Sequence, residues 1–180
     1  MVQQLNSDLY VCPRLRTPMA ANFMADIAVT ENLCNIMTSL IHPDLFRASQ
    51  ESISTIKNNP SLVASYHENV QLWPSVFGAI QVIVNRLTPA HRDQGGFPTS
   101  YDLLLSLGTH KEARMNLREL GATFRYTPGC VMFLSGKVLL HECMSWSGGD
   151  RICVTHFIKD TVHERCSVQR PRWPTEKDIL

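Results

Sequence analysis

The chain has 180 residues, of which 44% are hydrophobic and 18% are charged, and its formal net charge is +1. A chain of this size and composition buries enough apolar surface to fold without disulfides or a structural metal, so any bound metal is expected to serve chemistry. The composition excludes a disordered protein and a strongly basic one. The small net charge neither supports nor excludes a DNA substrate.

The cysteines and the N-terminal sequence indicate an intracellular protein. Six cysteines are irregularly spaced and include no C-x-x-C pair, which is typical neither of a zinc cage nor of a secreted disulfide framework. The opening "MVQQLNSDLYVCPRL" lacks a basic segment followed by an apolar one, and no stretch approaches about 18 uninterrupted apolar residues. We expect free thiols, no membrane association, and a nuclear location with the cytoplasm as the alternative.

The first third of the chain is predicted to be helical. From Met19 to about Leu40, apolar residues recur at helical spacing without proline or glycine, which predicts one amphipathic helix. Pro43 suits the first turn of a second helix that runs to about Ile56 and ends near "KNNP". The segment "PSLVASYHE" adds a short third helix.

The sequence changes to a β pattern at "SVFGAIQVIVNRL", where β-branched residues alternate over a short range and Pro89 ends the predicted strand. "YDLLLSLG" predicts a buried strand. "ATFRYTPGCVMFLSGKVLLHECM" predicts strands interrupted at its two X-Gly turns, and "SGGD" predicts a turn into the strand "RICVTHFIK".

Helices followed by about six short strands with tight turns predict an α+β chain, namely a helix-backed antiparallel barrel or jelly roll. We expect one structural domain. Its parts are a helical support region over residues 1–75, a β core over 76–160 and a C-terminal tail over 161–180.

Four polar residues on these β segments form a candidate site, three of them as metal ligands. In "LTPAHRDQGG", His91 and Asp93 stand two residues apart at a strand end, so their side chains point the same way, and His141 follows on "KVLLHECM". Two imidazoles and one carboxylate that leave coordination positions open form the facial triad of non-haem Fe(II) oxygenases. Arg151, after the "SGGD" turn, offers a planar fork for the far carboxylate of a dicarboxylic acid such as 2-oxoglutarate.

Phe157 shares one face of its strand with Arg151, so it is either a stacking surface for a planar substrate or an ordinary core residue. The remaining histidines receive no role, because a lone histidine is more often a surface or internally paired residue. "HRD" is also a kinase catalytic-loop triplet. The other kinase motifs are missing, so the kinase interpretation fails.

The words "NRLTPAHRDQGG", "YDLLLSLGTH", "LGATFRYTPGCVMFLSGKVLLHE" and "WSGGDRICVTHFIKD" resemble the TET and J-binding-protein (JBP) branch of Fe(II)/2-oxoglutarate dioxygenases, especially its compact fungal-type members. The resemblance implies a double-stranded β-helix with iron at its mouth. His91, Asp93 and His141 match the family's metal ligands. Arg151 matches the arginine that binds the distal carboxylate of 2-oxoglutarate.

Three further assignments follow from the resemblance. Phe157 matches an aromatic residue that stacks on a flipped base, and Asn85 is assigned to the other end of the co-substrate. Cys153 stands where many relatives have Ser or Thr beside the same carboxylate, and a thiol is a weaker hydrogen-bond partner.

The reaction implied is oxidative decarboxylation of 2-oxoglutarate by O2 to succinate and carbon dioxide, coupled to oxidation of a methyl group. The family's expected substrate is 5-methylcytosine in DNA, extruded from the duplex to reach the iron. Phosphate contacts would come from cations near the mouth, Arg92 first, followed by Lys111, Arg114 and Arg118, each of which has an ordinary solvated surface as its alternative.

Two alternatives remain open. The same chemistry could act on N-methyladenine, RNA, a protein side chain or a small molecule, or the chain could be a catalytically inactive β-helix binding domain. The sequence has no cysteine-rich zinc module and no basic stripe, and it is short for an enzyme that grips a duplex. We expect a monomer.

Overall fold

The computed structural model describes residues 9–179. The chain divides into two compact units. The first, called the helical unit, includes the residues up to Val76 and those from Asp160 onward. The second, called the β unit, is Phe77–Lys159. Among the described residues, no helix is both long enough and apolar enough to cross a membrane.

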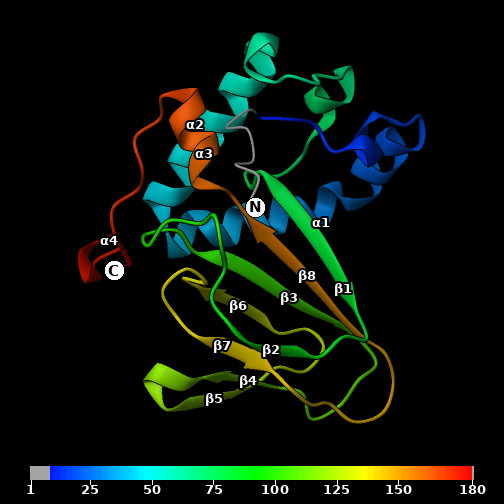
Figure 1. Cartoon of the computed structure of the whole chain (residues 1–180), viewed down its shortest axis with the longest axis vertical. Helices are drawn as coiled ribbons and strands as arrows, with labels where there is room; N and C mark the ends of the chain where they lie inside the picture. The colour runs from blue at the N-terminus through cyan, green and yellow to red at the C-terminus, as the bar shows by residue number, and fades with distance from the viewer. Residues whose placement is uncertain (1–8, 180) are drawn as a thin grey trace, which may run out of the picture. The chain divides into compact units, whose positions relative to one another are not determined.

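The helical unit is built around two consecutive helices (Figure 1). Its α-helices and 3-10 helices are η1 (Pro13–Arg16), α1 (Met19–Ile41), α2 (Pro43–Asn58), η2 (Pro60–Leu62), η3 (Glu68–Leu72), α3 (Asp160–Cys166) and α4 (Glu176–Ile179). Both long helices lie where the sequence predicts them. α2 begins with Pro43 in its first turn, and the buried His42 side chain caps it by accepting the Leu45 N–H at 3.3 Å.

The chain beyond the β unit joins the helical unit. α3 packs against α2, where Ser52 Oγ lies 3.0 Å from His163 Nδ1 and both residues are fully buried. Ala48 of α2 forms an apolar cluster with Cys166 and Val168. The segment expected to be a C-terminal tail thus contributes α3 and apolar residues to the helical unit.

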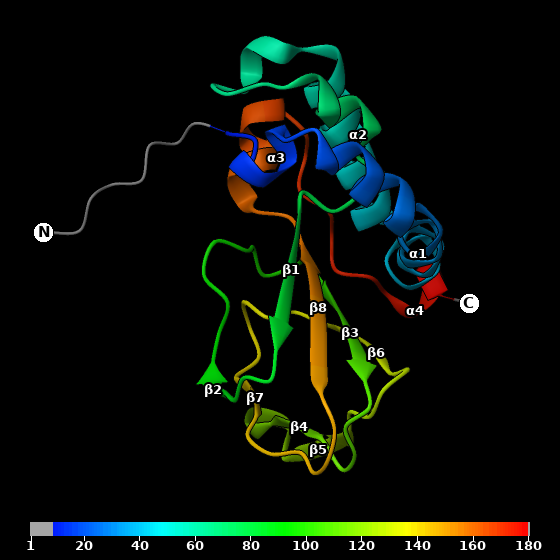
Figure 2. The ribbon, with the colours of Figure 1, turned by 90° about the vertical axis from the view of Figure 1, so that its right-hand side faces the viewer.

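The β unit contains two four-stranded antiparallel sheets, with strand orders β1-β8-β3-β6 and β2-β7-β4-β5 (Figures 1 and 2). The strands are β1 (Ala79–Val84), β2 (Thr88–His91), β3 (Asp102–Gly108), β4 (Arg114–Leu117), β5 (Ala122–Arg125), β6 (Val131–Leu134), β7 (His141–Cys143) and β8 (Arg151–Phe157). This order is that of a jelly roll, so the predicted fold is confirmed.

Side chains from the two sheets meet in one core. Leu104 and Cys153 come from the first sheet, and Met115, Leu117 and Cys143 come from the second. Because successive side chains of a strand point to opposite faces, these strands carry apolar residues inward at alternate positions. The layer between the sheets is therefore where side chains of β7 and β8 converge.

Two strands escaped sequence prediction. β2 includes Pro89, which was expected to end a strand, but β2 lies at the edge of its sheet, where a missing N–H is tolerated. β4 alternates between polar residues and the buried Met115 and Leu117, a pattern too short to detect. Both strands belong to the sheet that carries the two histidines of the predicted metal site.

Candidate functional site

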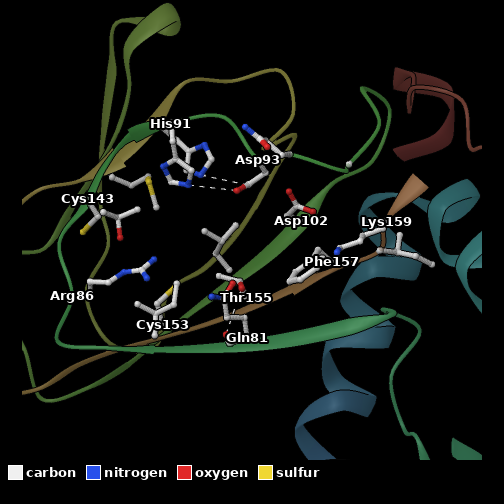
Figure 3. A pocket seen from close by; sticks show the side chains of 18 of the residues that line it. Gln81, Arg86, His91, Asp93, Asp102, Cys143, Cys153, Thr155, Phe157 and Lys159 are labelled. Atoms are coloured by element: carbon white, nitrogen blue, oxygen red, sulfur yellow. Dashed lines mark hydrogen bonds and ion pairs between the residues drawn. The ribbon is translucent and has the colours of Figure 1, made fainter. Parts of the chain in front are cut away.

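A cavity of about 360 Å³ opens within the β unit, and every residue that lines it belongs to that unit. Four alternate residues of β8 form one wall: Arg151, Cys153, Thr155 and Phe157. Figure 3 shows side chains from both sheets directed into the same space. The predicted sharing of one face by Arg151 and Phe157 is therefore observed.

Two histidines meet across the pairing of β2 with β7. His91 lies directly opposite His141 in the antiparallel register, and their ring centroids are 4.3 Å apart. Asp93 follows two residues later, with Oδ1 3.4 Å from His91 Nε2 and Oδ2 3.6 Å from His141 Nε2 (Figure 3). One ligand atom from each residue lies within 4.8 Å of the others, a spacing that could hold a metal ion.

Backbone carbonyls orient both rings. His91 Nδ1 lies 2.8 Å from the Pro89 carbonyl oxygen, and His141 Nδ1 lies 3.0 Å from that of Leu139. A carbonyl only accepts, so Nδ1–H of each ring donates to it, and Nε2 lies on the side of Asp93, where it can bind a metal. Two neutral imidazole nitrogens and a carboxylate suit Fe(II), so the donor set fits the metal that the sequence predicts.

Asp93 is held close to a second carboxyl group. Its N–H donates to the Gly136 carbonyl at 2.8 Å, and a Cβ at position 136 would overlap both the Asp93 and the Asp102 carboxyl oxygens. Asp102 lines the cavity from the start of β3 and is hydrogen-bonded to Asp93. Burial, and then the Asp93 charge, raise the pKa of Asp102 to about 8. Glycine at 136 therefore makes room for the carboxyl pair.

Arg151 is buried, with 2% of its surface exposed. It donates from Nη1 to the Arg86 carbonyl at 3.0 Å and interacts with the Cys143 thiol. Its Cζ lies 5.9 Å from the ring centre of Tyr126 and 5.6 Å from that of Trp146. Its Nε has no hydrogen-bond partner, and within residues 9–179 no carboxylate pairs with it. An uncompensated buried cation is costly, so this geometry suits an anionic ligand.

Sequence reasoning missed two lining residues near these groups. Arg86 adds a second guanidinium to the cavity (Figure 3), and Asp102 adds the second carboxyl group. The fold brings each of them to the cavity. In the sequence, each is only a single charged residue beside an apolar strand, so its spacing did not indicate a site. Cys153, expected as a weak co-substrate contact, lines the cavity and has its Sγ 3.3 Å from the Tyr126 hydroxyl.

Asn85 has a different place from the one predicted. It does not line the cavity, its φ is +50°, and its amide donates to Asp150 Oδ1 while its own oxygen accepts the Arg151 N–H, both at 2.8 Å. The side chain fastens the β1–β2 turn to the start of β8. These bonds support Arg151 and favour an indirect role over the direct co-substrate contact expected from the sequence.

The side chain of Arg92, expected to contact DNA phosphates, does not reach the cavity. Its side chain is exposed, pairs with Glu119, donates to the Val138 carbonyl at 2.9 Å, and lies outside the cavity lining. Because consecutive residues of a strand point to opposite faces, the alternation that aims His91 inward turns Arg92 away. Lys111, Arg114 and Arg118 are also absent from the lining, and Arg118 pairs with Glu142 at 2.6 Å.

Phe157 lies at the other end of the β8 wall from Arg151. It is half-buried, and Thr155, Gln81 and Lys159 line the cavity around it (Figure 3). The cavity thus has two guanidinium groups at one end and one aromatic ring among polar side chains at the other. The His91, Asp93 and His141 group faces the same space.

Comparison with known proteins agrees with this arrangement. The sequence model of the Tet_JBP family, described as the oxygenase domain of the 2OGFeDO superfamily, matches residues 13–160. The chain belongs to this family. The match confirms the family expected from the sequence, and with it Fe(II), 2-oxoglutarate and O2 as the cofactors of this oxygenase domain.

A solved structure shares the fold. NgTET1 in complex with 5mC DNA is similar with a TM-score of 0.61 and 16% sequence identity, and the match covers 98% of this chain. The chain spans 64% of the length of that NgTET1 chain. No curated protein matches the sequence significantly. The likeness to NgTET1 supports the jelly-roll architecture of the Tet_JBP domain.

Proposed function

We propose that this Tet_JBP chain is an Fe(II)- and 2-oxoglutarate-dependent dioxygenase that oxidises the methyl group of a methylated base in DNA, with 5-methylcytosine as the first candidate. One observation carries the proposal: the group of His91, Asp93 and His141 and the buried Arg151, whose Nε lacks a hydrogen-bond partner, face one cavity. A metal-binding group and an anion-binding group in one cavity are what a metal-dependent enzyme with a dicarboxylate co-substrate requires.

The three ligands divide the work of holding iron. His91 and His141 offer Nε2 while carbonyls fix their rings, and Asp93 supplies the negative charge. Iron bound there would supply the redox chemistry that couples decarboxylation of 2-oxoglutarate to oxidation of the substrate. Gly136 leaves the room in which the Asp93 carboxylate reaches both rings.

The distal carboxylate of 2-oxoglutarate is assigned to Arg151. Its free Nε and its planar guanidinium can hold a carboxylate by two parallel hydrogen bonds, which would supply the missing partner. Tyr126 and Trp146 limit how far the guanidinium can turn. Arg86 adds positive charge at the same end, as a dianionic co-substrate requires.

The Phe157 end of the cavity is assigned to the substrate. Phe157 offers a ring face to a planar base, and stacking on an aromatic side chain stabilises an extruded base by about 1–3 kcal/mol. A base within a duplex cannot enter a cavity between two sheets, so the target nucleotide must flip out. The solved neighbour was captured with 5mC DNA, which makes this substrate the first to test. A DNA substrate would in turn place the enzyme in the nucleus.

A second candidate keeps the chemistry and changes the substrate to N-methyladenine, RNA, a protein side chain or a small molecule. The observation in its favour is that Arg92 and Arg118, two cations expected to hold phosphates, pair instead with Glu119 and Glu142. The third candidate, an inactive binding domain, has less support because every expected ligand and Arg151 face the cavity.

The test is succinate formation by the iron-loaded chain with 2-oxoglutarate, with and without a duplex that contains 5-methylcytosine, followed by mass spectrometry of the nucleosides. We expect duplex-stimulated succinate together with an oxidised base, and neither product with the Asp93→Ala variant. Succinate without base oxidation would favour the second candidate, the same chemistry on another substrate. No succinate from a folded, iron-loaded sample would overturn the enzymatic function.

A further inference from the structure

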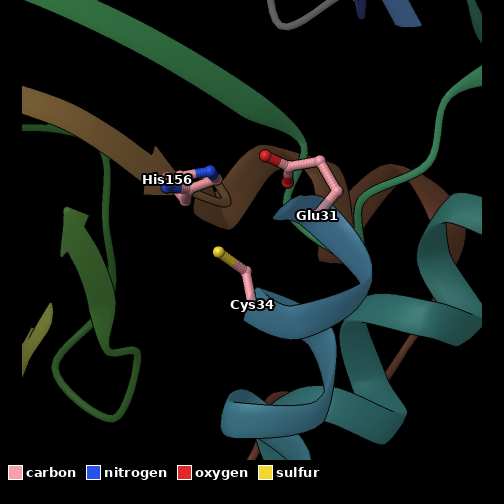
Figure 4. Close-up of side chains that lie close together, drawn as sticks. All are labelled: Glu31, Cys34 and His156. Carbon is pink, nitrogen blue, oxygen red and sulfur yellow. The ribbon is translucent and has the colours of Figure 1, made fainter. Parts of the chain in front are cut away.

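Helix α1 has its larger apolar side chains on the outside. Its buried residues are Ala20, Met24, Glu31, Cys34 and Thr38, a set that is mostly small or polar. Figure 4 shows two of them, Glu31 and Cys34, about one turn apart on α1. At 100° per residue, the opposite side of the helix carries larger aliphatic side chains, which are solvent-exposed. Their exposed fractions are Met19 79%, Val29 81%, Leu33 57%, Ile36 56% and Leu40 66%.

These exposed residues follow a heptad repeat. Alternate steps of three and four residues along one side of the helix give a continuous exposed row, called the α1 seam: Met19, Asn22, Asp26, Val29, Leu33, Ile36 and Leu40. Five of its seven members are apolar, and the seam is apolar without interruption from Val29 to Leu40. A spacing of 3.5 residues maintained along a helix is the pattern by which one helix packs along another.

The seam requires a cover. A helix with a second apolar side that faces solvent has a surface that is normally buried, and a contiguous exposed apolar row marks an interaction surface. If each of the five large residues contributes on the order of 100 Å², two copies would bury about 1,000 Å² together, which is near the lower limit for a specific protein interface. The seam is therefore large enough to associate with an equal partner.

The charges favour an identical partner. The positions that flank the seam are Phe23, Thr30 and Met37 on one side and Ala25, Asn32 and Ser39 on the other. None of these residues is charged, so two copies meet without repulsion along the flanks. Partner choice between different helices usually depends on complementary charges at such positions, and α1 offers none.

Asp26 determines the direction. In a parallel, in-register pair the two Asp26 side chains would face each other in the same layer, which brings like charges together. In an antiparallel pair centred on the seam, Asp26 of one copy lies near Leu33 of the other, and the helix dipoles oppose each other favourably. Asn22 then lies one turn from the end of the paired segment, where water still reaches its amide, as at the polar rim of an interface.

We propose that α1 forms an antiparallel helix pair with α1 of a second copy of this chain. The apolar half of the seam, from Val29 to Leu40, supplies most of the buried surface, and Asp26 excludes the parallel arrangement. This differs from the monomer expected from the sequence and does not rest on the proposed function.

The test is the mass of the full chain in solution, measured by sedimentation velocity from about 1 to 100 μM, since an interface of this size supports at most modest affinity. We expect a concentration-dependent dimer that Leu33→Glu abolishes. Leu120→Glu is the matched control, because Leu120 lies in the β unit and is 60% exposed, close to the 57% of Leu33. The control should dimerise like the unmodified chain.

A second variant, expected to strengthen dimerisation, separates a lost interface from a misfolded chain. Asp26→Leu removes the one charge from the seam and should tighten dimerisation at least tenfold, while far-ultraviolet circular dichroism stays unchanged. A chain that stays monomeric at about 100 μM overturns the proposal. A dimer that Leu33→Glu leaves intact, or that Asp26→Leu fails to tighten, also overturns it.

Discussion

The buried polar side chains of Thr38 and Ser52 in the helical unit differ from that of Arg151 in the β unit. Thr38 Oγ donates to the Cys34 carbonyl at 2.7 Å, and Ser52 contacts His163. In the β unit, Arg151 is equally buried, yet its Nε lacks a partner and the cavity lies beside it. A buried polar group with an internal partner supports the fold, whereas one beside a cavity without a partner indicates a ligand.

Removing a metal ligand should break the β unit's chemistry most completely. His91→Ala or Asp93→Ala should lower succinate formation at least about 1,000-fold and release iron, because each removes a donor from a three-residue set. Iron content by metal analysis and turnover check this. Arg92→Ala is the control, since Arg92 lies between the two residues but pairs with Glu119 outside the cavity. Iron retained by His91→Ala would remove that residue from the ligand set.

Arg151→Met should separate binding from stability. Loss of the guanidinium should raise the KM for 2-oxoglutarate about 100-fold, as expected for a charge-assisted bidentate contact. The ligand-free variant should be as stable as the parent or more stable, because an uncompensated buried charge has been replaced by an apolar chain. Thermal unfolding with and without 2-oxoglutarate measures both effects. A destabilised variant with an unchanged KM would make Arg151 a structural residue like those of the helical unit.

Gly136→Ala should act on the site without replacing any ligand residue. The added Cβ would overlap the Asp93 and Asp102 carboxyl oxygens and displace Asp93 from the histidines, so iron affinity should fall about tenfold or more. Gly96→Ala is the matched control, because its Cβ would meet only Lys137 at an ordinary 3.8 Å. Iron titration of both variants compares them, and equal affinities would show that the carboxyl pair tolerates the displacement.

Substitution of His163 should have the smallest effect on the chemistry, because it should change only the free energy of unfolding. Burial lowers the pKa of His163 to about 4, so the folded state keeps this ring neutral while the unfolded state protonates it near 6.5. Its contribution is complete above pH 6.5 and is lost as the pH falls toward 4, by up to about 3 kcal/mol. Urea unfolding at several pH values should show this slope, and His163→Gln should flatten it. Iron binding at pH 7.5 should be equal in both chains.

The sequence predicted what depends on local spacing. The two long helices follow from apolar periodicity, and the two-residue step from His91 to Asp93 places both on one side of the chain. The grouping of His141 with His91 was predicted from ligand chemistry and from the motif resemblance, but their register was not, because strand register between distant segments is not encoded in either segment alone.

What was missed depends on contacts between distant segments. Arg92 and Asn85 were placed in the site because they adjoin it in sequence, but Glu119 and Asp150, from remote turns, hold them elsewhere. Asp102 stands beside Asp93 because Gly136 lets two chain segments approach closely. The exposure of the α1 seam could not be predicted for the same reason. Periodicity shows that a helix has an apolar face, but it does not show whether another segment covers that face.

A metal ion bound at this site would also stabilise the edge strand β2. β2 contains Pro89 and pairs with β7 irregularly, in register at Thr88 and again at His91, so it is fastened by few backbone bonds. An ion bound by both His91 and His141 would cross-link β2 to β7. Metal binding would then stabilise the pairing of these strands, and weaker pairing would lower the metal affinity. Amide hydrogens of β2 and β7 should therefore exchange with solvent faster once the ion is chelated away.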